Sequence, residues 1–295
     1  MKDRYLADNT RAVMERYNFT ASKRFGQNFI KDRSVLEDIV TASKISKEDI
    51  VLEIGPGIGV LTEFLSEAAG RVYAVEVDRG LIPILQETLK DCENVELVNE
   101  DIMKTDIKAL TGGAPFRVVA NLPYYITTPI VMSLLESDLN CRSLTVMVQK
   151  EVGERMTASP KTKDYGALTL AVGYRTKAAI VRKVPAGCFI PAPKVDSVFV
   201  HMDVYEEPPL KAEDEKFLFS VIRGAFNQRR KTLLNALSGH KELGLSREMI
   251  KEAIEKAGEK PAVRGEELSL EQFTKLSDIL YHLKDRQDVG ADVIL

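Results

Sequence analysis

The tetrapeptide Asn121-Leu122-Pro123-Tyr124 carries the most specific chemistry in the sequence, and it follows directly on the apolar run 117–120. That run predicts a buried strand, and ligands of open α/β sheets bind at the carboxyl ends of strands. The Asn121 side-chain oxygen and the Leu122 carbonyl supply two hydrogen-bond acceptors, which suits methylation of an exocyclic amine on a flat base. Pro123 keeps the preceding residue extended, and Tyr124 offers a face for stacking a base that has left its helix. A strand-ending turn with a buried tyrosine is the alternative interpretation.

The segment upstream of this motif has the pattern of a strand, a glycine turn and a helix. The β-rich run 50–54 leads into Gly55-Pro56-Gly57-Ile58-Gly59, and a helical pattern follows at 60–65. This order is the first unit of a Rossmann-like sheet, and its glycines permit close backbone approach to a ligand. The G-x-G-x-G spacing differs from the G-x-G-x-x-G of a pyrophosphate cradle.

The next two expected strands both lead to acidic residues. Glu76 ends the run 71–76, where its carboxylate suits a ribose diol, and the run 95–98 leads to Glu100-Asp101, where a carboxylate suits an adenine amino group. The glycine turn, these two acids and Asn121 occur in the order of successive strand ends. The ordered set predicts S-adenosylmethionine as the cofactor.

These motifs and three further segments resemble those of the ribosomal RNA adenine N6-dimethyltransferases, specifically the bacterial small-subunit type. The shared segments are Phe25-Gly26-Gln27-Asn28-Phe29, Glu53-Ile54-Gly55-Pro56-Gly57-Ile58-Gly59, Glu76-Val77-Asp78, Asn121-Leu122-Pro123-Tyr124, Phe189-Ile190-Pro191-Ala192-Pro193-Lys194-Val195-Asp196-Ser197 and Phe226-Asn227-Gln228-Arg229-Arg230-Lys231-Thr232. They run from near the N-terminus into the last quarter of the chain. The resemblance implies dimethylation of two adjacent adenines in the 3′-terminal hairpin of 16S rRNA, within the small (30S) ribosomal subunit.

The resemblance also implies which residues form the site. Residues expected to bind the cofactor are Asn28, Ile30, Gly55, Gly57, Glu76, Asp101 and Asn121. Residues expected to act on the target adenine are Asn121, Leu122, Tyr124 and Phe189. Phe189 precedes the rigid Pro191-Ala192-Pro193, so with Tyr124 it is expected to sandwich the base. The transferred methyl needs no acid for its neutral leaving group, and we expect no general base.

Charge is distributed unevenly along a chain whose formal net charge is only −3. Basic residues cluster at 23–33 and again at 223–231, whereas acids gather at 206–215 and 266–267. The pattern is compatible with one basic face for RNA phosphates. The residues expected to contact RNA are Arg223, Asn227, Arg230 and Lys231.

The organisation predicts two domains in a chain of 295 residues. Residues 1–205 read as a Rossmann-like class I methyltransferase domain of α/β class with an N-terminal arm, and residues 206–295 as a smaller all-α domain that contacts rRNA. Later strands are expected at 144–148, 167–172 and 197–202. One helix is expected over 217–237, and the tail from Lys284 is expected to be loosely ordered.

Composition restricts the other possibilities. The three cysteines are scattered and form no C-x-x-C pair, so we expect no metal site and no disulfide framework. No apolar run is long enough to span a bilayer and no signal-type segment begins the chain, so a cytoplasmic protein with no membrane partner is expected. The protein is also expected to be a monomer. Two alternatives remain. One is the antibiotic-resistance (Erm) type of enzyme, which methylates an adenine of 23S rRNA, and the other is a ribosome assembly factor with secondary catalysis.

Overall fold

The computed structural model describes residues 6–22 and 25–292, which divide into two compact units. The first unit contains the chain up to Glu154 together with Lys177–Val204. The second contains Arg155–Thr176 and the chain from Tyr205 onward. The expected boundary at 205/206 is present, but residues 155–176 belong to the second unit and not to the first as expected. These residues pack with the C-terminal helices.

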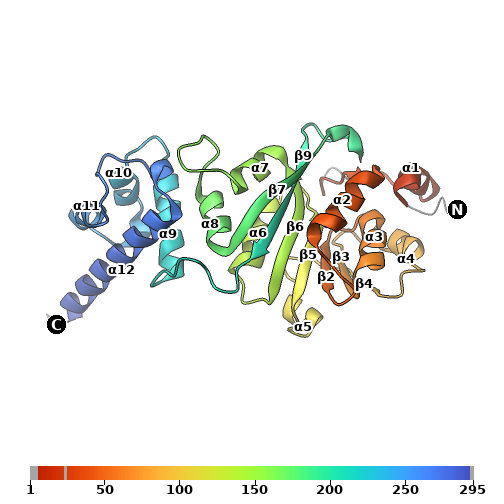
Figure 1. Ribbon diagram of the computed structural model, residues 1–295, viewed down its shortest axis with the longest axis horizontal. Coiled ribbons are helices and arrows are strands. Elements are labelled where there is room, and N and C mark those ends of the chain that lie inside the picture. Colours follow the sequence, from red (N-terminus) through yellow and green to blue (C-terminus); the bar gives the residue numbers. More distant parts are fainter. Residues whose placement is uncertain (1–5, 23–24, 293–295) are drawn as a thin grey trace. The chain divides into compact units, whose positions relative to one another are not determined.

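A sheet of seven strands in the order β4-β3-β2-β5-β6-β9-β7 forms the centre of the first unit (Figure 1). The strands are β2 (Ile50–Ile54), β3 (Arg71–Val75), β4 (Val95–Val98), β5 (Phe116–Asn121), β6 (Cys141–Gln149), β7 (Thr176–Val184) and β9 (Ser197–Val204). Strands β4, β3, β2, β5 and β6 pair in parallel, and β9 pairs antiparallel with β6. This mostly parallel sheet confirms the α/β prediction.

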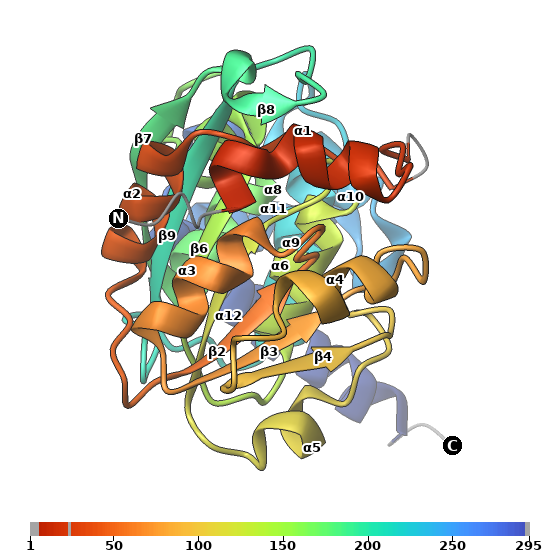
Figure 2. The same cartoon turned by 90° about the vertical axis from the view of Figure 1, so that its right-hand side faces the viewer.

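Helices and one short ribbon surround this sheet. The helices are α1 (Leu6–Arg16), α2 (Arg33–Ser43), α3 (Val60–Ala68), α4 (Ile82–Thr88), α5 (Ile107–Thr111), α6 (Thr127–Glu136) and α7 (Lys150–Met156), the last of which runs on into the second unit. In Figure 2, α3 and α4 lie beside the edge formed by β2, β3 and β4. The ribbon pairs β1 (Phe29–Ile30) with β8 (Phe189–Ile190), so the N-terminal arm is held by a segment far away in sequence.

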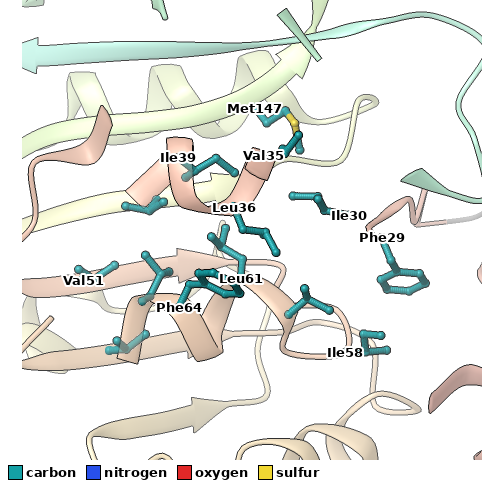
Figure 3. Close-up of a cluster of buried hydrophobic side chains, with 14 of the residues drawn as sticks. Phe29, Ile30, Val35, Leu36, Ile39, Val51, Ile58, Leu61, Phe64 and Met147 are labelled. Atoms are coloured by element: carbon teal, nitrogen blue, oxygen red, sulfur yellow. The ribbon is translucent and has the colours of Figure 1, made fainter. Parts of the chain in front are cut away.

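The main apolar core of the first unit lies between the sheet and helices α2, α3 and α4. Figure 3 shows Leu36 of α2, Leu61 of α3 and Met147 of β6 among the side chains that meet there. The strand register puts two polar side chains on the same face of the sheet. Glu53 is paired with Val119, and Asn121 stands two residues further along the same strand. Because side chains alternate along a strand, Glu53 and Asn121 share one face near its carboxyl edge.

The second unit is helical. Its remaining helices are α8 (Ala167–Arg175), α9 (Glu215–Phe226), α10 (Leu233–Ser238), α11 (Arg247–Lys256) and α12 (Leu270–Asp292), with short 3₁₀ turns at Lys241–Leu243 and Gly265–Glu267. A further 3₁₀ turn, Ala186–Cys188, belongs to the first unit. Helix α12 continues nine residues past Leu283, so the tail begins as regular helix and not as loose chain.

The strand expected at 167–172 is wrong, because these residues form helix α8. The short apolar run fits either a buried strand or a buried helix, so periodicity does not decide between them. Packing decides: the Tyr174 ring meets Phe219 of α9 edge-to-face at 5.5 Å between centroids. Tyr165, just before α8, packs likewise against Phe226 at 6.1 Å.

The single helix expected over 217–237 is also wrong, because α9 ends at Phe226 and α10 begins at Leu233. Thr232 caps α10 by accepting a hydrogen bond from the Asn235 backbone N–H. The Leu233 N–H donates to the Val263 carbonyl at 2.7 Å, a tertiary contact that an unbroken helix would forfeit. The break turns residues 227–232 into a connection whose first five residues are exposed.

Candidate active site

A cavity of about 500 Å³ opens at the carboxyl edge of β2, β3 and β5. This volume is in the range of sites for small organic cofactors. Most of the residues expected to form the site line it, namely Asn28, Ile30, Gly55, Gly57, Glu76, Asp101, Asn121, Leu122 and Tyr124. Side chains separated by almost a hundred positions in the sequence thus share one cavity, as the order of strand ends predicts.

Two glycines of the loop after β2 have backbone conformations that require glycine. Gly55 has φ of +71° and Gly57 has φ of +65°, in the left-handed region. A Cβ at Gly57 would also lie 2.8 Å from Cε1 of Phe29, a residue of the arm. A Cβ at Gly55 would meet nothing within 4 Å, so this glycine leaves open space inside the cavity. The loop therefore gives a ligand direct access to its backbone.

Glu76 follows β3 and is only 5% exposed. Its carboxylate accepts hydrogen bonds from the Gly57 N–H at 3.2 Å and from the Asp78 N–H at 2.8 Å. Burial raises the pKa of Glu76 to about 7, although these N–H groups oppose the rise. The carboxylate is thus fixed in position, with acceptor capacity left for a diol.

Asp101, beyond β4, uses one carboxylate oxygen to accept the Met103 backbone N–H at 3.0 Å. Within the described chain, no donor reaches its other oxygen. Asp101 therefore presents a free oxygen to the cavity, and the two Glu76 oxygens, each of which accepts one hydrogen bond, keep the capacity for a second. A nucleoside offers matching donors in its ribose hydroxyls and its adenine amino group.

Glu53 is a cavity residue whose role the sequence reasoning missed. It is 1% exposed, and its Oε2 has no hydrogen-bond partner among the described residues. Burial raises the pKa of Glu53 to about 8, and the neighbouring Glu76 carboxylate adds to the rise. An unpartnered buried carboxyl oxygen at the end of β2 fits a site for a positively charged ligand. The available signal was an acid two residues before the first glycine of the loop.

Asn121 ends β5 with its side chain half-buried at the cavity. Its amide Nδ2 donates to the Asn28 carbonyl at 2.9 Å, which ties the arm to the sheet. This bond orients the amide, and its Oδ1 has no partner in the part of the chain that the structure describes. The Leu122 N–H donates to the Met147 carbonyl at 3.2 Å, which anchors the backbone just before the Leu122 carbonyl, the second expected acceptor.

Tyr124 lies beside these acceptors, with its ring at the cavity and its hydroxyl 2.7 Å from the Ser197 Oγ. Ser197 is fully buried on β9, so it holds the ring from behind. Burial raises the pKa of the Tyr124 phenol, so the hydroxyl stays neutral. The hydroxyl is therefore engaged in the hydrogen bond to Ser197, and the ring face is the part available to a ligand.

Phe189 does not line the cavity, which corrects its expected place opposite Tyr124. It is 2% exposed and packs in the apolar core, because its β8 strand pairs with β1 and turns the ring inward. The aromatic residues that do line the cavity are Phe25, Phe29, Tyr124 and Tyr125. The rigid prolines that follow Phe189 fix the chain but do not determine which way the ring points.

The arm is fastened to the cavity by a second side chain that the sequence reasoning did not assign. Gln27 donates from Nε2 to an Asp78 carboxylate oxygen at 2.8 Å and accepts the Ser22 backbone N–H at 2.7 Å. Asp78 follows Glu76 closely, so Gln27 ties the arm to the loop that carries the buried acid. The arm thus forms one wall of the cavity.

The expected RNA-contacting residues lie at the end of α9 and in the connection to α10. Arg223, Asn227, Arg230 and Lys231 are all exposed. None of the three cations among them forms an ion pair with another described residue. Their neighbour Arg229 differs, because it pairs with Glu266 at 3.1 Å and donates to the Lys163 carbonyl at 2.8 Å. The three cations are therefore available to phosphates, whereas Arg229 is committed to the fold.

Two further features of the described residues bear on ligands. No group of three or more His, Cys, Asp or Glu side chains in this part of the chain is arranged to hold a metal ion. None of the described helices combines the length and apolar character needed to cross a membrane.

The fold and the cavity together define a class I S-adenosylmethionine-dependent methyltransferase, in agreement with the sequence prediction. The acceptors of Glu76 and Asp101, the left-handed glycines and the open space at Gly55 fit the cofactor's ribose, adenine and amino-acid parts. Solved structures with a similar fold include the 23S rRNA methyltransferase ErmE, 28% identical with a TM-score of 0.66 over 86% of this chain and 100% of that one. A dimethyladenosine transferase from Plasmodium falciparum is 27% identical, with a TM-score of 0.71 over 84% and 95%.

The model of the family described as ribosomal RNA adenine dimethylase matches residues 18–280. The chain is 52% identical to a ribosomal RNA small subunit methyltransferase A from Lachnoclostridium phytofermentans, over 94% of this chain and 98% of that protein. It is 51% identical to the protein of the same name from Clostridium acetobutylicum, over 92% and 98%. The chain belongs to the ribosomal RNA adenine dimethylase family, which confirms the resemblance found in its motifs.

Proposed function

We propose that this protein dimethylates N6 of two adjacent adenines near the 3′ end of small-subunit rRNA, in the cytoplasm and late in subunit assembly. The observation that carries the chemistry is the free Asn121 Oδ1 beside the Tyr124 ring, at a cavity whose acids suit a nucleoside cofactor. The choice of subunit is supported by the relatives named small subunit methyltransferases, which align over nearly their whole length.

The chain's own residues would position the reactants. Glu76 would hold the ribose hydroxyls, Asp101 the adenine amino group, and Gly55 would lie against the amino-acid part of the cofactor. When bound, S-adenosylmethionine supplies an electrophilic methyl group. Asn28 and Ile30 of the arm would close over it.

The target adenine amine is a poor nucleophile, because its lone pair is delocalised into the ring. The Asn121 Oδ1 and the Leu122 carbonyl would accept its two N–H groups and favour a pyramidal nitrogen. Tyr124 would stack on the base that has left its helix. Catalysis of this kind depends on positioning and exclusion of water, for which effective molarities are large.

Tyr124 provides the first test of this arrangement. Tyr124→Ala should lower kcat/KM by roughly tenfold or more, because it removes one base–aromatic stack worth about 1–3 kcal/mol. Tyr124→Phe keeps the ring and loses only the bond to Ser197, so it should remain within a few-fold of the wild type. Steady-state methylation of undermethylated small subunits measures both. Equal loss in the two variants would show that the hydroxyl, and not the ring, is what the reaction needs.

The basic residues after α9 provide the test of substrate docking. Replacing Arg223, Arg230 and Lys231 together by alanine should weaken subunit binding and flatten its salt dependence, because phosphate contacts release counterions. Cofactor affinity should not change, since these residues lie outside the unit that holds the cavity. A matched variant replaces Lys241, Lys251 and Lys256 by alanine, which removes the same charge from other exposed positions of the helical second unit. It should bind the subunit nearly as the wild type does.

A methylation assay decides between the two ribosomal substrates. Small and large subunits, each stripped of its methyl groups, are offered separately with labelled cofactor, and the modified bases are mapped. We expect modification of two adjacent adenines of the small subunit. Methylation confined to large-subunit rRNA would overturn the proposed substrate and leave only the shared chemistry.

A further inference from the structure

Tyr125 is an exposed aromatic side chain at the mouth of the cavity. It is 59% exposed, more than any other large apolar side chain among the described residues. It lines the same cavity as Tyr124, its neighbour in the chain. The two rings differ in their surroundings, because Tyr124 is half-buried and bonded to Ser197 whereas Tyr125 forms no such bond in the described structure.

The backbone beneath Tyr125 is fixed. The Ile126 N–H donates to the Pro123 carbonyl at 3.2 Å, and the Thr127 Oγ1 donates to the same carbonyl at 3.0 Å. These bonds close a tight turn from β5 into α6. On the arm, a Cβ added to Gly26 would lie 3.7 Å from Cδ1 of Tyr125, which is ordinary van der Waals distance. The arm backbone at Gly26 therefore lies near one edge of the ring, and more than half of the Tyr125 side chain is exposed.

An exposed aromatic ring on a fixed backbone turn beside an active site is suited to stacking. No ring or cation contact covers Tyr125 within the described residues. Bases of single-stranded RNA stack on such side chains, and this stacking tolerates any base because each base has a π face. The adenine in the cavity is joined through its backbone to nucleotides that must remain outside it.

We propose that Tyr125 stacks the base adjacent to the adenine being methylated and holds it outside the cavity. This inference rests on the proposed function, in which the two target adenines are neighbours. While one adenine occupies the cavity beside Tyr124, the other has lost its stacking partner. Tyr125, one residue along the chain, replaces that partner and lowers the cost of extruding the first base.

A double-mutant cycle between protein and RNA tests the contact. Wild type and Tyr125→Ala are assayed on intact undermethylated small subunits and on subunits reconstituted with rRNA in which one or the other target adenine is abasic. We expect Tyr125→Ala to lower kcat/KM by roughly tenfold on the intact substrate, the value of one stack. The abasic neighbour should lower the wild-type value similarly, and combining both changes should add little.

Controls separate this contact from other roles of Tyr125. Tyr125→Phe and Tyr125→Trp keep an aromatic face and should retain activity, whereas Tyr125→Leu keeps apolar volume and should not. Val181→Ala, another exposed apolar position, should leave kcat/KM unchanged. Cofactor affinity of Tyr125→Ala, measured by calorimetry, should equal that of the wild type.

Three results would overturn the inference. They are full activity of Tyr125→Ala on the intact subunit, an undiminished tenfold loss on both abasic substrates, and a loss explained by weaker cofactor binding. Wild-type turnover on the intact subunit tests the proposed function separately. If the wild type methylates no small-subunit adenine, the proposed function fails, and the inference that depends on it fails at that step and not at Tyr125.

Discussion

Replacing Asn121 with alanine should lower kcat on small subunits by roughly 10²–10³-fold, the usual cost of deleting one preorganised hydrogen-bonding group that acts in the transition state. The physical reason is the free Oδ1, because alanine lacks this acceptor for an N–H of the target amine. Single-turnover methylation with labelled cofactor measures the chemical step directly. The substitution should leave cofactor affinity within a few-fold of the wild type.

The Asn121 side chain also donates a hydrogen bond to the arm, and the effect of losing that bond has to be separated from the loss of the acceptor Oδ1. Its Nδ2 holds the Asn28 carbonyl, so alanine also loosens the arm. Gln27→Ala is the matched control, because it removes the bond between the arm and the loop after β3 and leaves the amine acceptors in place. We expect Gln27→Ala to weaken cofactor binding and to recover near-normal kcat at saturation. A comparable kcat defect in both variants would assign the effect of Asn121 to the arm.

Replacing Glu76 with alanine should weaken cofactor binding by roughly 100-fold. Two charge-assisted bonds to a ribose diol contribute about 1.5 kcal/mol or more each, and 1.4 kcal/mol corresponds to tenfold in affinity. Alanine also leaves the Gly57 and Asp78 N–H groups without their buried acceptor. Glu76→Gln keeps the size of the side chain and one acceptor oxygen, so its cofactor affinity should lie between those of the wild type and Glu76→Ala. Calorimetry showing unchanged affinity in Glu76→Ala would remove this residue from the site.

The pH dependence of cofactor affinity follows from the same carboxyl group. The pKa of Glu76 is raised to about 7, so in the free protein the group becomes protonated as the pH falls through 7. A neutral acid accepts weaker hydrogen bonds, so affinity should decrease from pH 8 to pH 6. Glu76→Gln should lose this step. The pKa of Glu53, raised to about 8, predicts a separate gain in affinity for a cationic ligand above pH 8.

The sequence by itself determined the parts of the protein that depend on local pattern. The strands expected at 50–54, 71–76, 95–98 and 117–120 were predictable to within one residue at each end, because β-rich apolar runs end there in glycine or polar residues. Parallel strands bring their carboxyl ends to one edge, so the order of the motifs along the chain already implied one shared cavity. The motifs also determined the family, because several specific segments occur together.

Only the tertiary structure decided which way ambiguous segments fold. The apolar run 167–172 fits a strand or a helix equally, and contacts of the adjoining Tyr165 and Tyr174 with α9 select the helix. The break between Phe226 and Leu233 likewise depends on the bond from Leu233 to Val263, which a helical pattern cannot reveal.

Tertiary structure also decided which side chains reach the cavity. Phe189 turns into the core because its strand pairs with the arm, whereas Glu53 ends as a buried acid with an unpartnered oxygen. Tyr124 and Tyr125 are identical and adjacent in sequence, yet one is tied to Ser197 and the other is exposed. Residue type and spacing limit the chemistry a side chain can perform. Burial and partners are properties of the packed whole, so they assign which side chain performs it.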